Sequence, residues 1–69
     1  MTTTQIERVK REIKELTAKL EKATERLNRT IEIMKEDASW GMFLEEDTKW
    51  VEYYTRHINR LNNMIEGVA

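Results

Sequence analysis

The stretch TQIERVKREIKELTAKLEKATERLNRTIEIM, residues 4–34, decides the fold of this 69-residue chain. Apolar or small residues recur in it at alternating steps of three and four, which is the heptad spacing of a helix with one apolar seam. The a positions are Ile6, Ile13, Leu20, Leu27 and Met34, and the d positions are Val9, Leu16, Ala23 and Thr30. Such a seam has to lie against other helices, so the stretch predicts an all-α protein.

The composition agrees with a small helical protein. Charged residues make up 36% and hydrophobic residues 39%, with no Pro, two Gly and no Cys. We expect one domain over residues 1–69, near the lower size limit for an independent core. The lack of Cys excludes disulfides, thiolate metal ligands and a Cys nucleophile. With neither a signal-peptide pattern nor an apolar run of membrane-spanning length, we expect a cytoplasmic protein without membrane association.

The net charge of −1 is unevenly distributed. Residues 1–30 carry eight basic and five acidic side chains, whereas residues 31–52 carry two basic and seven acidic ones. Residues 53–69 carry two basic and one acidic. Solvated helix faces are the ordinary explanation. The alternative is a molecule with a basic and an acidic end, which would orient its partners.

We expect a first helix over about 4–37, begun by a capping box between Thr4 and Glu7. A turn over about 38–43 follows, where Ser39 is a candidate cap and Gly41 a candidate for positive φ. This turn is unusually apolar. Trp40 and Phe43 therefore either plug the end of the molecule or form a partner-binding tip.

A second helix is expected over about 44–66, with Glu45, Glu46 and Asp47 at its positive end. Its seam is Leu44, Val51, Tyr54, Ile58, Leu61, Ile65 and Val68, and its phase differs from that of the first heptad. The phase change and Gly41 favour a turn over one continuous rod. A second line at seven-residue spacing, interpreted mainly as core, is Phe43, Trp50, His57 and Met64. The fold prediction is an antiparallel helical hairpin.

The two predicted helices differ in length, at about 50 Å and about 34 Å for a rise of 1.5 Å per residue. If the turn centres near Gly41, Val68 lies opposite about Ile13. Ile6, Val9 and Ile13 would then lack a partner within the chain. A bare apolar seam predicts a second copy, so we expect a homodimer or higher oligomer packed as a helical bundle.

The sequence offers little chemistry for catalysis, and we expect neither an enzyme nor a cofactor or metal site. It has one His, one Ser and no glycine-rich phosphate loop. Tyr54 occupies the position three residues before His57 where a second metal ligand would help. His57 is best interpreted as a histidine at the core edge or an interface; a ligand-binding role is the alternative and a catalytic role the least favoured.

One group of residues could bind a ligand. Lys49, Tyr53, Arg56 and Arg60 lie on one face of the second helix, with Trp50 and His57 beside them. A solvated face is the ordinary explanation; a site for a phosphate-bearing ligand is the alternative. Glu52 is placed to pair with Arg56, which makes Arg60 the less compensated cation. Because the net charge is not positive, extended duplex DNA is not favoured.

The stretch Asp47-Thr48-Lys49-Trp50-Val51, continuing to Ile58, Met64 and Ile65, resembles the second helix of small phage helical-hairpin proteins that sequester cyclic-oligonucleotide immune signals. The resemblance covers about a third of the chain and does not include the long first heptad. It implies an oligomer that holds a nucleotide between subunits without cleaving it, with Lys49 and Trp50 as the corresponding residues.

Three functions remain open from the sequence. The first is a homo-oligomeric hairpin that binds and sequesters a host protein, as phage inhibitors and adaptors do. The second is a sponge for a cyclic-nucleotide type of ligand, held at a subunit interface. The third is a purely structural assembly protein.

Overall fold

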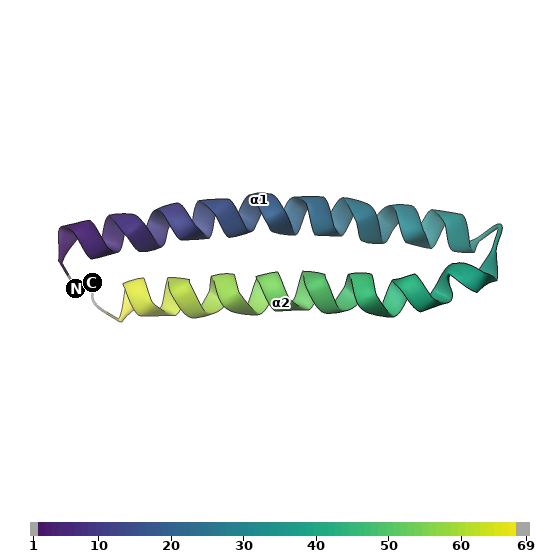
Figure 1. The fold of residues 1–69 in the computed structure, drawn as a ribbon. Helices are drawn as coiled ribbons and strands as arrows, with labels where there is room; N and C mark the ends of the chain where they lie inside the picture. The colour runs from purple at the N-terminus through teal and green to yellow at the C-terminus, as the bar shows by residue number, and fades with distance from the viewer. Residues whose placement is uncertain (1, 68–69) are drawn as a thin grey trace.

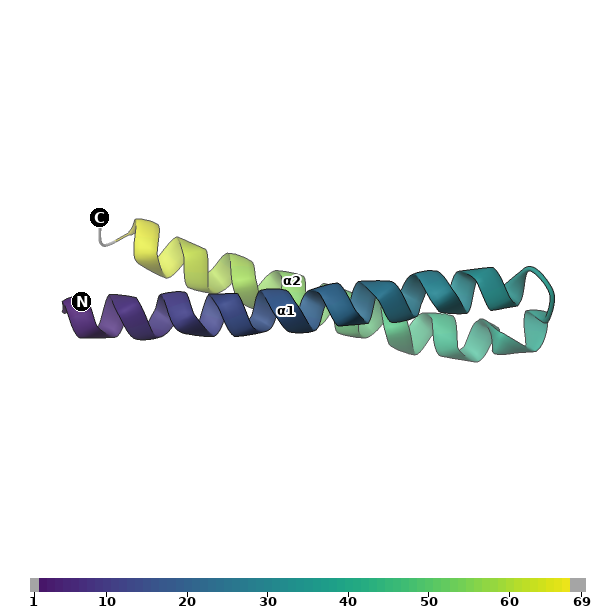
Figure 2. The same ribbon diagram turned by 90° about the horizontal axis from the view of Figure 1, so that it is seen from above.

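The computed structural model describes residues 2–67 and consists of two long antiparallel helices joined by a tight turn (Figure 1). Helix α1 covers Thr3–Met34, the 3₁₀ helix η1 covers Ala38–Trp40, and helix α2 covers Gly41–Glu66. The molecule measures 51 × 16 × 12 Å. Seen from above, the two helices cross at a shallow angle (Figure 2). The predicted all-α helical hairpin is confirmed.

The heptad seam of α1 is the side of the helix that packs against α2. All nine seam residues of α1 are buried or half-buried, and Leu16 and Thr30 are the most enclosed. The seam residues of α2 from Leu44 to Ile65 are likewise buried or half-buried, whereas Val68 lies outside the described residues. Burial of the repeat therefore accounts for the pairing of the helices.

The capping box at the start of α1 lies two residues earlier than predicted. The hydroxyl of Thr2 accepts from the backbone N–H of Gln5 at 3.2 Å, and Oε1 of Gln5 accepts from the N–H of Thr2 at 2.9 Å. Because residues 2–4 are all threonine, a capping box can form either between Thr2 and Gln5 or between Thr4 and Glu7. The chain uses Thr2 with Gln5, so the predicted pair of Thr4 and Glu7 is wrong.

The turn also comes earlier than predicted, because Asp37 interrupts the helix. Asp37 is extended (φ −139°, ψ 98°), and its Oδ1 accepts from Ser39 N at 3.1 Å and from Ser39 Oγ at 2.6 Å. Asp37 is thus the cap and Ser39 its donor, which reverses the predicted role of Ser39. Gly41 has φ −56°, and no residue of the described chain has positive φ. The predicted left-handed Gly41 is therefore wrong.

The two hydrogen bonds from Ser39, first that of its hydroxyl and then that of its backbone N–H, lower the pKa of Asp37. A lowered pKa in the folded state means that the ionised form is favoured by folding. The contribution of this cap is therefore present above the pKa of the unfolded chain and is lost as the pH falls through the lowered value.

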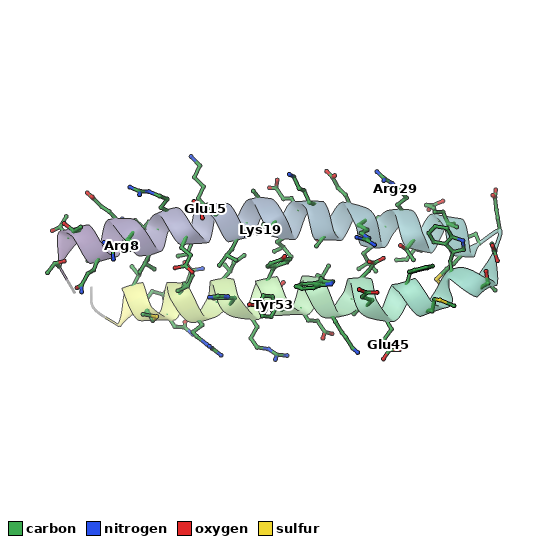
Figure 3. All side chains as sticks on the ribbon, in the orientation of Figure 1. Arg8, Glu15, Lys19, Arg29, Glu45 and Tyr53 are labelled. Carbon is green, nitrogen blue, oxygen red and sulfur yellow. The ribbon has the colours of Figure 1, made fainter. Side chains whose placement is uncertain are left out.

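The register of the hairpin follows from the early turn. Arg29 lies level with Glu45, and Lys19 lies level with Tyr53 (Figure 3). Farther along, Nε2 of His57 is 3.9 Å from Oε1 of Glu12. Residues near Ile13 therefore face residues near Leu61 rather than Val68, and Val9 faces the level of Ile65.

In this register the start of α1 extends less far beyond the end of α2 than predicted. Ile13 and Val9 lie level with Leu61 and Ile65 of α2, and both are half-buried. The predicted absence of a partner within the chain is wrong for these two residues, because α1 ends and α2 begins about three residues earlier than expected. Ile6 is half-buried, and the level opposite it lies outside the described residues. Their place in an interface between copies remains a prediction.

One polar cluster is buried in the seam. Thr30 and Asp47 are each 4% exposed, and Oγ1 of Thr30 donates to Oδ2 of Asp47 at 2.6 Å. Nε of Arg26 lies 3.2 Å from Oδ1 of the same carboxylate. Asp47 is thus held across the hairpin, and the predicted role at the positive end of a helix is wrong: α2 has no acid in its first turn.

Neither α1 nor α2 has an apolar segment of the length needed to cross a membrane, within residues 2–67.

Replacing Thr30 with Val should lower the free energy of unfolding by about 1–3 kcal/mol, because Asp47 loses a donor while remaining buried. Urea denaturation followed by circular dichroism measures the change. The matched control is Thr17→Val, since the exposed Thr17 hydroxyl bonds only the Ile13 carbonyl of its own helix. Equal losses in the two variants would contradict a special role for Thr30.

Candidate functional site

The hairpin presents two broad faces, one on each side of the seam. In antiparallel helices packed along a and d positions, the g positions of the two helices flank one side and the e positions flank the other. The first side, here called the tryptophan face, carries Lys19, Arg26, Ile33, Phe43, Trp50, His57 and Met64. The second side, here called the threonine face, carries Thr17, Thr24, Ile31, Thr48, Thr55 and Asn62.

The predicted basic row of α2 does lie on one surface. Lys49, Trp50, Tyr53 and Arg56 line one shallow depression together with Glu46 and Glu52, and Arg56 and Arg60 line the next. Lys49 is 3.7 Å from the carboxylate of Glu45, with both side chains exposed. All lining residues come from α2. The outer surface of one helix cannot enclose a small ligand, so such a site would need a second copy.

The two arginines of this row form no close ion pair within the described part of the chain. Among residues 2–67, no ion pair within 4 Å involves Arg56 or Arg60. The expected pairing of Glu52 with Arg56 is therefore not formed, although both residues line the same depression. Both cations are available to an anionic ligand.

His57 is turned toward α1. Its Nε2 is 3.9 Å from Oε1 of Glu12, its side chain is 33% exposed, and its ring meets that of Tyr53 edge-on at 5.9 Å. This is the position of a histidine at the edge of the helix interface, which agrees with the favoured interpretation. That His57 forms one wall of a ligand site along the basic row of α2 stays a prediction.

Trp50 is held by neighbouring aromatic rings yet remains half exposed. Its ring stacks on Tyr54 at 5.8 Å and 27°, and it meets Tyr53 at 5.9 Å and 83°. Its exposed fraction is 49%. Met64, on the same line, is 44% exposed. The interpretation as core is therefore wrong for Trp50 and Met64 in the single hairpin, where they border the seam, whereas His57 is turned toward α1.

A groove between the helices was not predicted from the sequence. Trp50 and Tyr54 of α2 line it together with α1 residues, namely Lys19, Lys22, Ala23 and Arg26. A second depression continues it toward the turn, lined by Lys22, Glu25, Arg26, Arg29, Thr30, Ile33 and Trp40. The available signal was the spacing of three, four and three among the α1 cations, which puts them on one helix face.

At the turn, Trp40 and Phe43 pack against each other. Their ring centroids are 5.0 Å apart, and they are 37% and 38% exposed, so most of each ring is covered. Trp40 also lines the depression beside Ile33. Met42, by contrast, is 71% exposed. The geometry favours the plug over the tip for Trp40 and Phe43.

The threonine face is uncharged from Thr17 to Ile31 at its e positions. The hydroxyls of Thr17, Thr24 and Thr48 each donate at 2.8 Å to the backbone carbonyl four residues earlier. Because these hydroxyls already have acceptors, the face offers methyl groups and few unmet hydrogen bonds.

Within residues 2–67 no group of three or more His, Asp or Glu side chains is arranged to hold a metal ion. No protein-family model, curated protein or solved structure matches the chain. Function therefore has to be argued from the two faces themselves.

If Trp40 and Phe43 are plugs, replacing both with Ala should lower the free energy of unfolding by about 2–4 kcal/mol. Thermal and urea denaturation measure the loss. Met42→Ala is the matched control from the same turn, and its effect should stay within about 0.5 kcal/mol because the side chain is exposed. Unchanged stability together with lost partner capture would identify these rings as anchors instead, and loss of neither property would contradict both interpretations.

Proposed function

We propose that this chain is a non-catalytic binding protein that works as a homo-oligomer. Hairpins pack through their threonine faces into a helical bundle and present their tryptophan faces to a macromolecular partner, which they sequester. A host protein is the partner class expected of a small phage-type inhibitor or adaptor.

The observation that carries the proposal is the incomplete core of the single hairpin. None of its described large side chains is fully buried, and the only buried apolar residues are Leu16 and Leu61. Its accessible surface is 5595 Å², whereas a compact monomer of this mass exposes about 4600 Å². Association with a second hairpin would cover the excess and enlarge the core.

Charge selects the threonine face as the interface between copies. Burying an unpaired charge is costly, and the tryptophan face carries Lys19, which has no ion pair among residues 2–67, beside its aromatic rings. The e positions of the threonine face carry Lys10 alone, near the open end. Half-buried seam residues such as Leu20 and Leu27 border this face and would complete their burial there.

A non-catalytic role is supported by how the few reactive groups are used. His57 faces Glu12, and the Ser39 hydroxyl donates to Asp37 at 2.6 Å. The Ser39 hydroxyl is thus engaged in a local contact of the turn, and His57 lies at the edge of the helix interface. We therefore assign function to surfaces rather than to a catalytic centre.

Replacing Thr24 with Arg should shift the assembly to monomers, because a charge would enter the proposed interface. Sedimentation equilibrium at micromolar concentration measures the mass relative to the 8.3 kDa chain. The control is Ala18→Arg, which adds the same side chain to the exposed back of α1 and should leave the oligomer intact. A wild-type protein that sediments only as a monomer would refute the proposal.

A second candidate function is a sponge for a phosphate-bearing small ligand, held between the α2 rows of two copies. The unpaired Arg56 and Arg60 beside Tyr53 and Trp50 favour it. Forked arginine donors match phosphate, and the rings offer a surface for a base. A structural assembly protein would need neither feature.

Arg60→Glu should abolish binding of cyclic dinucleotides by this row and leave the helical content unchanged, since both residues are good helix formers. Tryptophan fluorescence titration measures binding, which should weaken as salt rises. Glu66→Arg, an opposite charge change near the exposed end of α2, serves as the control. Lack of any fluorescence change with millimolar ligand would exclude this candidate.

A further inference from the structure

We propose that the groove between the helices on the tryptophan face binds single-stranded nucleic acid. The basic groove, as it is called here, consists of Lys19, Lys22, Arg26 and Arg29 from α1 with Trp50 and Tyr54 from α2. It lies on the opposite side of the hairpin from the proposed interface between copies. The inference is therefore independent of the oligomer, but it replaces the host protein by a nucleic acid as the macromolecule held on the tryptophan face.

The four cations form a continuous line along α1. They span ten residue steps, or about 15 Å at the rise of an α-helix. Across both parts of the groove, Glu25 is the only lining carboxylate. Among residues 2–67, no ion pair within 4 Å involves Lys19, Lys22 or Arg29. Three of the four charges are thus free to meet a phosphate backbone, in a chain whose net charge is −1.

Arg26 differs from the other three because Asp47 lies beneath it. Its Nε is 3.2 Å from Oδ1 of Asp47, while its side chain remains 72% exposed. The contact with the buried carboxylate holds the start of the guanidinium group in place. Arg26 therefore marks a fixed point in the line, between the freely exposed Lys22 and Arg29.

Trp50 supplies a platform for a base. One side of its ring rests on Tyr54, and half of its surface is open. The ring is positioned before any ligand arrives, which reduces the entropy lost on binding. Trp40 lines the groove at the end near the turn. Cations between two aromatic side chains are the arrangement by which proteins hold unpaired bases and their phosphates.

This combination favours a single strand over other anions. A duplex keeps its bases stacked inside, so Trp50 would gain no partner from it. An acidic peptide would satisfy the cations and leave the open ring unused. A single small phosphate would engage only part of the line of cations. A single strand uses both the charges and the rings.

The test is fluorescence anisotropy of a labelled oligouridine titrated with the full chain at low salt, repeated at several salt concentrations. We expect binding that weakens with salt. Each lost phosphate contact lowers the log–log salt slope by about 0.7 for single strands, so Lys22→Gln/Arg29→Gln should lower it by about 1.4. Lys10→Gln/Lys14→Gln removes the same charge from exposed positions of α1 outside the groove and should change the slope far less.

A second variant separates stacking from charge. Trp50→Leu keeps an apolar side chain against Tyr54 and removes the ring, and it should weaken oligouridine binding by roughly 5- to 100-fold. Circular dichroism confirms that each variant remains helical. Because Arg60 lies outside the groove, Arg60→Glu should retain most oligouridine binding, even if it removes binding of cyclic dinucleotides.

Four results would overturn the inference. They are no binding at low salt, equal effects of the two double glutamine variants, equal affinity for a duplex of the same length, and equal competition by polyglutamate. The last result would identify the groove as a site for an acidic protein segment. None of these results bears on the mass measured by sedimentation.

Discussion

The hydrogen bond from Thr30 to the buried carboxylate of Asp47 ties the two helices together at one relative position, since an apolar seam alone allows helices to slide by a heptad. Asp47 lies in the seam of α2, seven residues before Tyr54, and is 4% exposed, so any shift that removed both Thr30 and Arg26 would leave a buried charge without partners. The interaction selects one alignment of the hairpin, as buried polar groups do in other helical assemblies.

That alignment gives the hairpin two unlike faces. It sets the α1 cations beside Trp50 and brings Glu12 to His57. It also leaves the back-bonded threonines together on the other side, where Lys10 is the one charged residue at the e positions. The threonine face is thus suited to close packing with another copy. The tryptophan face is suited to an anionic partner that can also stack on aromatic rings. The proposed interface between copies and the proposed nucleic-acid site both depend on this difference between the two faces.

The sequence predicted the helices well because burial follows the heptad period, and every described seam residue from Ile6 to Ile65 is at least half-buried. It misplaced the turn because Asp37 binds Ser39 instead of continuing the helix, a local competition that periodicity does not report. The row of Lys49, Tyr53, Arg56 and Arg60 was predictable because it lies on one helix. The basic groove was not, because it is formed by both helices and depends on the register that the Thr30–Asp47 contact fixes between residues seventeen apart in the sequence.

The register itself is open to one direct measurement, an isotope-edited nuclear Overhauser spectrum of the wild-type chain. The account predicts a cross-peak between the Thr30 methyl group and the β protons of Asp47, whose polar atoms are 2.6 Å apart. A turn centred on Gly41 would place Thr30 opposite about residue 52, which is a shift of α2 by about 7.5 Å at that level. The contradicting result is a Thr30 methyl group that contacts protons near Val51 and gives no cross-peak to Asp47.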